Sequence, residues 1–151
     1  MRTVVQRVSG ASVSVPAENY EVSAGKGLLV LAAFEDSDTD SDIEWMSRKI
    51  CSLRIFDDSE GVMNLSVKDI GGDILCVSQF TLYASTARGN RPSYIKAAKP
   101  AVSSPMYDSF CSALEEHLGK SVRKGIFGAD MKVSLLNDGP VTIIIDSKIK
   151  E

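Results

Sequence analysis

The chain has 151 residues, 44% of them hydrophobic and 25% charged, which is typical of a globular domain that buries its own core. Its net charge of −3 gives no general attraction to nucleic acid, and its longest apolar runs, such as residues 27–34, are too short to span a bilayer. Residues 1–10 alternate polar and apolar side chains, unlike a signal peptide. We therefore expect a cytoplasmic protein with no membrane segment.

Strands followed by a helix are predicted for the first third of the chain. Residues 3–15 alternate in hydrophobicity and predict two short strands around Ser9 and Gly10, and residues 27–34 predict one continuous apolar strand. Apolar side chains then recur at helical spacing, at Ile43, Met46, Ile50 and Leu53. The acidic side chains between Asp36 and Glu44 are expected to complement the positive end of this helix dipole.

The middle of the chain predicts a hairpin, a long strand and a basic loop. The hairpin turns at residues 57–61, and residues 73–84 form the longest strand-like run of this region. Residues 87–105 are rich in Gly, Pro and Ser, have no clean period and predict a loop.

A second helix and two strands are predicted for the last third. Pro105 is expected at the first helical position, followed by a buried stripe made of Met106, Phe110, Leu114 and Leu118. Residues 131–138 and 141–147 predict the closing strands. Because strands cluster instead of alternating with helices, we expect an α+β fold, with antiparallel β-sheets forming a barrel-like core and two main helices in a single domain, residues 1–151.

Three cysteines and one histidine limit the chemistry available to the chain. Cys51, Cys76 and Cys111 are widely spaced and odd in number, so we expect small buried hydrophobes in place of a disulfide framework or a zinc site. His117 lies in a polar helical stretch and is interpreted as a surface residue, not as the base of a Ser-His or Cys-His mechanism. No metal or cofactor is predicted.

The basic side chains are concentrated in one segment. From Ile74 to Tyr107 there is no Asp or Glu, whereas Arg88, Arg91, Lys96 and Lys99 all lie inside it. This segment suits a limited contact with a phosphate backbone, although charge alone is equally compatible with a solvated loop.

The Gly-Pro pair at residues 139 and 140 interrupts a strongly strand-forming run, "LLNDGPVTIIIDS". Proline has no N–H for a β-ladder and glycine has no side chain to pack, so a central strand should exclude both. Either the pair is a turn between two strands, or its backbone is presented to a partner.

The segment "VSQFTLYA" carries hydroxyl side chains that resemble nucleophiles. A serine or threonine nucleophile needs a base, and no His, Asp or Glu lies within this segment. On local grounds, half-buried hydroxyls of a strand are the simpler interpretation.

Several motifs together resemble the D-aminoacyl-tRNA deacylase family. They are "MRTVVQRVSGASVSV", "LRIFDDSEGVMNLS", "VSQFTLYA", "RGNRPSY" and "FGADMKVSLLNDGPVT" with its continuation "IIIDS", and they cover nearly the whole chain in the family's order. One departure is the longer stretch "VPAENYEVSAG", residues 15–25, which replaces a shorter hairpin and touches no motif.

The resemblance implies hydrolysis of the ester that joins an amino acid to the 3′-terminal adenosine of tRNA. The implied catalytic residues are Ser78, Gln79, Phe80 and Thr81. Backbone N–H groups near Gln79 and Phe80 are expected to stabilise the oxyanion, and the vicinal ribose 2′-hydroxyl to help activate water. Thr81 is assigned a supporting role because it lacks a base, and Phe127 and Met131 are expected to pack against the adenine.

The resemblance also implies a homodimer in which a cis Gly139–Pro140 peptide enters the active site of the partner subunit, with Arg7 holding the loop. Two parallel carbonyls would bind the protonated α-amino group, so that a D-side chain points outward and an L-side chain meets the backbone. Glycine has no side chain to clash, so glycyl-tRNA, including glycine mischarged on tRNA(Ala), should also be accepted. The basic segment would contact the acceptor stem.

Three alternatives remain open from the sequence. A related deacylase with inverted chirality tolerance would carry a trans Gly-Pro bond and admit some L-residues. A non-catalytic nucleic-acid-binding module could retain the fold without the reaction. An α+β domain of another role would require both "SQFTLY" and "NDGPVT" to be accidental.

Overall fold

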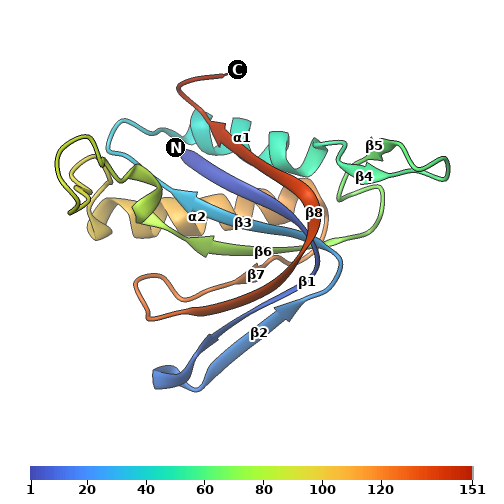
Figure 1. Cartoon of the computed structure of the whole chain (residues 1–151), viewed down its shortest axis with the longest axis horizontal. Coiled ribbons are helices and arrows are strands. Elements are labelled where there is room, and N and C mark those ends of the chain that lie inside the picture. The colour runs from blue at the N-terminus through green and yellow to red at the C-terminus, as the bar shows by residue number, and fades with distance from the viewer. Residues whose placement is uncertain (151) are drawn as a thin grey trace.

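The computed structural model describes residues 1–150, and a strongly curved six-stranded sheet forms its centre (Figure 1). Its strands are β1 (Arg2–Val15), β2 (Tyr20–Ala24), β3 (Gly27–Ala33), β6 (Asp73–Ser78), β7 (Arg123–Lys124) and β8 (Lys132–Asp146). The other elements are the helices α1 (Asp40–Ser52) and α2 (Pro100–Leu118), the hairpin β4 (Phe56–Asp57) with β5 (Met63–Leu65), and the 3-10 helices η1 (Pro16–Glu18) and η2 (Phe80–Tyr83). The predicted α+β fold with a barrel-like core and two main helices is confirmed.

The pairing of the sheet is mixed, which corrects the expectation of antiparallel sheets alone. β1 is antiparallel to β2, β3 and β8, whereas β3–β6 and β6–β7 are parallel. The chain passes through α1 and the β4–β5 hairpin between β3 and β6, and a crossover of this length permits parallel pairing. As a result, the carboxyl ends of β3 and β6 meet at one edge of the sheet.

Both faces of β3 and β6 are buried, which explains their continuous apolar sequences. One face packs against α1 and α2, and it carries Leu28, Val30, Ala32, Ile74 and Cys76. The opposite face carries Leu29, Leu75 and Val77, which pack against Val8, Ala11 and Val13 of β1. β1 contributes side chains to both sides of β3 and β6, because the sheet curves and brings the second half of β1 over the opposite face.

β1 is one continuous strand, where the sequence predicted two strands around Ser9 and Gly10. β8 runs beside both of its halves, while β3 pairs with the first half and β2 with the second. The register between β1 and β8 shifts between Gln6↔Thr142 and Val8↔Asn137, so residues 138–141 bulge opposite the single residue Arg7. The Gly139–Pro140 peptide within this bulge is cis.

The helices largely follow the predicted stripes. α1 begins after Thr39, which forms a capping box with Asp42, so the acidic cluster supplies a specific cap as well as a favourable charge. α2 begins at Pro100, five residues before the predicted start, and Pro105 lies inside the helix. Pro100 occupies the position predicted for Pro105, because a first-turn proline loses no helical hydrogen bond.

The described helices include none that is long and apolar enough to cross a membrane. The three cysteines are free and buried, as expected.

Candidate active site

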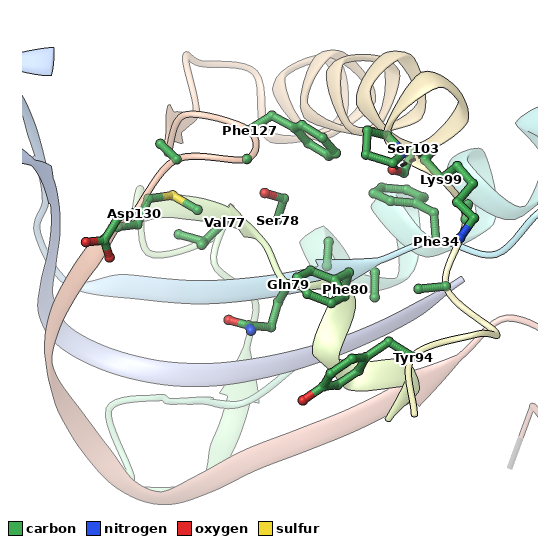
Figure 2. Close-up of a pocket in the computed structure, with 18 of the residues that line it drawn as sticks. Phe34, Val77, Ser78, Gln79, Phe80, Tyr94, Lys99, Ser103, Phe127 and Asp130 are labelled. Atoms are coloured by element: carbon green, nitrogen blue, oxygen red, sulfur yellow. Dashed lines mark hydrogen bonds between the residues drawn. The ribbon is translucent and has the colours of Figure 1, made fainter. Parts of the chain in front are cut away.

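A pocket of about 570 Å³ opens where the carboxyl ends of β3 and β6 meet the first turn of α2 (Figure 2). Four backbone segments form its walls: residues 32–34, residues 77–80, residues 97–100 and residues 127–131. Of the residues singled out in the sequence, Ser78, Gln79, Phe80, Phe127 and Met131 all line this one pocket. Its volume is within the range of about 300–1,000 Å³ typical of small-molecule sites.

β6 ends at Ser78, so the predicted strand over residues 73–84 is wrong beyond that point. β3 pairs with β6 only as far as Ala32 and Ser78, and the Gln79 N–H closes this ladder by donating to the Ala32 carbonyl at 2.7 Å. Without a further partner the chain turns into η2. Phe80 and Thr81 therefore follow each other around a helical turn instead of alternating on a sheet.

Arg2 holds η2 against the sheet. Its Nη1 donates to the Leu82 carbonyl at 3.0 Å, and its Nε and Nη2 donate to Asp146 of β8 at 3.1 and 2.9 Å. The guanidinium carbon also lies 4.9 Å from the centre of the Tyr83 ring. The end of β8 is thus connected through Arg2 to the pocket wall.

The start of η2 leaves two backbone donors beside the pocket. The N–H groups of Phe80 and Thr81 have no acceptor among the described residues, as expected for the first turn of a helix. The Gln79 N–H, which the sequence also suggested as an oxyanion donor, is already bound to Ala32. The Thr81 hydroxyl accepts a hydrogen bond from the Gln79 side-chain amide and does not line the pocket.

Apolar side chains line the pocket across from Phe80 (Figure 2). Phe127 packs at a tilt against Tyr107 of α2, with ring centroids 6.0 Å apart, and it points into the pocket (Figure 2). Met131 lies over Gly125, where an added Cβ would come within 2.5 Å of the Met131 sulfur. Because Gly125 has no side chain, the Met131 side chain can pack directly against its backbone.

The candidate bases among residues 1–150 are few. Asp130, the only carboxylate that lines the pocket among described residues, is 82% exposed and paired with Lys132. His117 lies near the opposite end of α2 and contacts Glu44 at 3.0 Å. Burial raises the pKa of the Cys51 thiol to about 11 and that of Cys76 well above its ordinary value, so neither is a thiolate near neutral pH.

No cluster of three or more His, Cys, Asp or Glu side chains able to hold a metal ion occurs within residues 1–150.

Arg7, Gly139 and Pro140 are not among the residues that line the pocket. The Arg7 guanidinium is nearly buried and donates to the carbonyls of Asp138 and Ile55 at 3.0 and 2.7 Å. The Asn137 amide donates to the carbonyls of Arg7 and Val141 at 2.9 and 3.3 Å. These two side chains fix the bulge of β8, and Gly139 and Pro140 remain exposed at its tip.

The sequence missed several residues of the pocket. Phe34, Ala98 and Ser103 form part of its wall, and Tyr94 stands beside Phe80 at its mouth (Figure 2). Tyr94 lies in the quoted motif "RGNRPSY", which could have drawn attention to it. Phe34 and Ser103 carry no comparable signal, because only the meeting of β3 with α2 brings them together.

The four basic residues of the loop segment are exposed. Arg88, Arg91, Lys96 and Lys99 form no ion pair with any residue in the described part of the chain, and Lys99 lines the pocket.

Known proteins share this sequence and architecture. A family model described as D-Tyr-tRNA(Tyr) deacylase matches residues 4–146. Proteins named D-aminoacyl-tRNA deacylase from Flavobacterium psychrophilum and Parabacteroides distasonis are 63% and 61% identical, over 100% of both chains in each pair.

Two solved structures extend the comparison. A structure of a protein named c-Myc DNA Unwinding Element Binding Protein is 39% identical, with a TM-score of 0.87 over 97% of this chain and 98% of that one. A probable eukaryotic D-amino acid tRNA deacylase is 21% identical, with a TM-score of 0.83 over 95% and 97% of the two chains, which shows the fold alone.

Proposed function

The chain belongs to the D-Tyr-tRNA(Tyr) deacylase family and is therefore a hydrolase, and we propose that it cleaves the ester bond of D-aminoacyl-tRNA to release a free D-amino acid and tRNA. The observation that carries this proposal is the pocket at the ends of β3 and β6, which Phe80 lines at the start of η2 together with the apolar side chains of Phe127 and Met131. The terminal adenosine lies against Phe127 and Met131, and the ester carbonyl lies beside η2. A cytoplasmic location is proposed with it, because aminoacyl-tRNA is used there.

Catalysis depends on backbone groups and on the substrate itself. The N–H groups of Phe80 and Thr81 stabilise the negative charge that develops on the ester carbonyl oxygen when water attacks. The vicinal ribose 2′-hydroxyl helps to activate this water. In support, the Thr81 hydroxyl accepts a hydrogen bond from the Gln79 side-chain amide, and no described His, Asp or Glu side chain hydrogen-bonds to it. Thr81 therefore supports the turn instead of attacking the ester.

Chiral selection comes from the bulge of β8, acting across a homodimer. Gly139 and Pro140 offer backbone carbonyls as acceptors for the substrate's ammonium group, and proline contributes no competing N–H. With the ammonium and the ester fixed, an L-side chain collides with the bulge and a D-side chain points away from it. The exposed position of this segment, outside the pocket of its own protomer, supports its use by a partner subunit.

Glycyl-tRNA is also a substrate in this scheme, including glycine mischarged on tRNA(Ala). Glycine has no side chain to collide with the bulge, so steric exclusion cannot reject it. Absence of glycyl-tRNA hydrolysis at an enzyme concentration that clears D-aminoacyl-tRNA would contradict this part of the proposal.

The test is hydrolysis of matched D-tyrosyl-tRNA and L-tyrosyl-tRNA by the purified wild-type chain. Release of D-tyrosine with the L-ester intact is the expected result. Equal release from both would refute the role of Gly139 and Pro140.

A second function, nucleic-acid binding without hydrolysis, is suggested by the 39% identical protein, which is named for binding a DNA unwinding element. It would be favoured if neither ester were cleaved while tRNA still bound.

A further inference from the structure

An exposed pair of aromatic rings stands at the mouth of the pocket. Phe80 is 57% exposed and Tyr94 38% exposed, and their ring centroids lie 5.2 Å apart in an edge-to-face arrangement (Figure 2). Ile95, the next residue along the chain after Tyr94, is 84% exposed. A contiguous exposed apolar surface of this kind marks a binding site more often than a scattered exposed side chain does.

The backbone holds this pair rigidly. Phe80 begins η2, which Arg2 ties to the sheet. Tyr94 follows a pair of backbone hydrogen bonds between Ser85 and Ser93, at 2.8 and 3.0 Å, and its carbonyl accepts from the Ala97 N–H at 3.0 Å. The two rings are therefore positioned before any ligand arrives, and little conformational entropy is lost on binding.

The charges of the segment that carries the pair favour an anionic ligand, and Asp130, the one carboxylate that lines the adjoining pocket among described residues, is paired with Lys132. The pair lies within the segment that contains no acidic residue, and Arg88, Arg91, Lys96 and Lys99 of that segment form no ion pair among residues 1–150. Aromatic faces combined with unpaired cations are the means by which proteins bind single-stranded nucleic acid, with bases on the rings and phosphates on the cations.

We propose that Phe80 and Tyr94 form a second nucleotide subsite, which stacks the cytosine base preceding the terminal adenosine of the tRNA acceptor end. The inference rests on the proposed function, because it takes the adenosine to occupy the adjoining pocket. The acceptor end of tRNA is single-stranded at this point, so its next base is free to stack. The basic residues of the segment lie along the phosphates that follow.

The test compares two D-tyrosyl esters that differ only in this nucleotide contact. One is the ester of adenosine alone, and the other is the ester of the trinucleotide CCA. We expect kcat/KM for the trinucleotide to exceed that for adenosine by about 5- to 100-fold, the range for stacking one base on an aromatic side chain. Tyr94→Ala should remove most of this ratio, because it should slow the trinucleotide ester far more than the adenosine ester, whereas Tyr94→Phe should retain the ratio.

Several outcomes would overturn the subsite. They are a wild-type ratio near one, a ratio unchanged by Tyr94→Ala, or cleavage of D-tyrosyl-tRNA with neither small ester cleaved. An equal loss on both esters would instead place Tyr94 against the amino-acid side chain or against a partner subunit. A D-alanyl ester, which lacks the tyrosyl ring, would test the first case, and sedimentation analysis, which reports the oligomeric state, would test the second. Failure to cleave D-tyrosyl-tRNA itself would reject the proposed function and is distinguishable from all of these results.

Discussion

The pocket and the bulge of β8 differ in the backbone groups that they leave unpaired: hydrogen-bond donors at the pocket and acceptors at the bulge. At the pocket, the N–H groups of Phe80 and Thr81 are left free where β6 runs out of a pairing partner. At the bulge, Gly139 and Pro140 leave the β1–β8 ladder, and proline has no N–H to offer. An aminoacyl ester needs donors for its developing oxyanion and acceptors for its ammonium group. In the proposed scheme, two separate irregularities of one sheet supply these donors and acceptors.

The two regions also differ in how they are held. The bulge depends on the nearly buried Arg7 and on Asn137, which bind its backbone directly. η2 depends on Arg2, whose side chain is one-third exposed and shared with Asp146. Disrupting the bulge should therefore have larger consequences than loosening η2.

The largest effect is expected for Arg7→Ala. The substitution leaves the carbonyls of Asp138 and Ile55 without their donor, which should lower the free energy of unfolding by about 2–4 kcal/mol. Displacement of Gly139 and Pro140 should also lower kcat/KM for D-tyrosyl-tRNA by about 100-fold. Chemical denaturation and deacylation assays measure the two effects. Arg54→Ala, which removes an exposed guanidinium bound to a single carbonyl, is the matched control and should change neither appreciably.

An intermediate effect is expected for Arg2→Ala at the other region. Loss of the bond to the Leu82 carbonyl should let η2 shift and lower kcat by about tenfold, with KM changed less, because the donors on η2 act mainly in the transition state. Steady-state kinetics separate the two constants, and Arg2→Lys should recover part of the loss. A rise in KM with unchanged kcat would instead indicate that Arg2 affects substrate binding alone.

A smaller effect is expected for Thr81→Val. If Thr81 only supports the turn through Gln79, deacylation should fall by less than about tenfold. Loss of a covalent nucleophile would cost about 10⁴-fold or more. Single-turnover rates on D-tyrosyl-tRNA distinguish these cases, and a collapse of the rate would require a base that the pocket does not show.

The smallest effect lies outside both regions, at the start of α1. Burial would raise the pKa of Asp42, but hydrogen bonds from Lys148, Ser147 and Thr39 together hold it well below its ordinary value. Because its folded-state pKa is depressed, Asp42 contributes stability above its unfolded pKa of about 3.9 and loses it as the pH falls further. Asp42→Asn should lower the free energy of unfolding by about 1 kcal/mol at pH 7.

This difference from wild type should shrink progressively as the pH falls from about 4 toward the depressed folded-state pKa of Asp42, and deacylation should be unchanged. Thermal unfolding at several pH values provides the measurement. A difference that persisted in acid would mean that the Asp42 charge is not its cause.

The accuracy of the sequence predictions varied from one element to another for physical reasons. The stripe of α1 was recognisable because helical periodicity is local, and the three cysteines were correctly expected to be buried. The strand over residues 73–84 was predicted too long because β propensity continues past Ser78, whereas the pairing partner ends at Ala33 of β3. The start of α2 was misplaced because two prolines, Pro100 and Pro105, both fit a helix start.

The sequence by itself determined the family, the α+β class and a minority of the pocket side chains, among them Ser78, Phe80 and Phe127, because these depend on motifs and periodicity along the chain. Only the tertiary structure decided which backbone donors are free. The Gln79 N–H donates to the Ala32 carbonyl, whereas the N–H groups of Phe80 and Thr81 have no acceptor among the described residues. It also decided that Arg7 faces the bulge and that Tyr94 stands against Phe80. Such contacts join segments distant along the chain, and no local pattern records them.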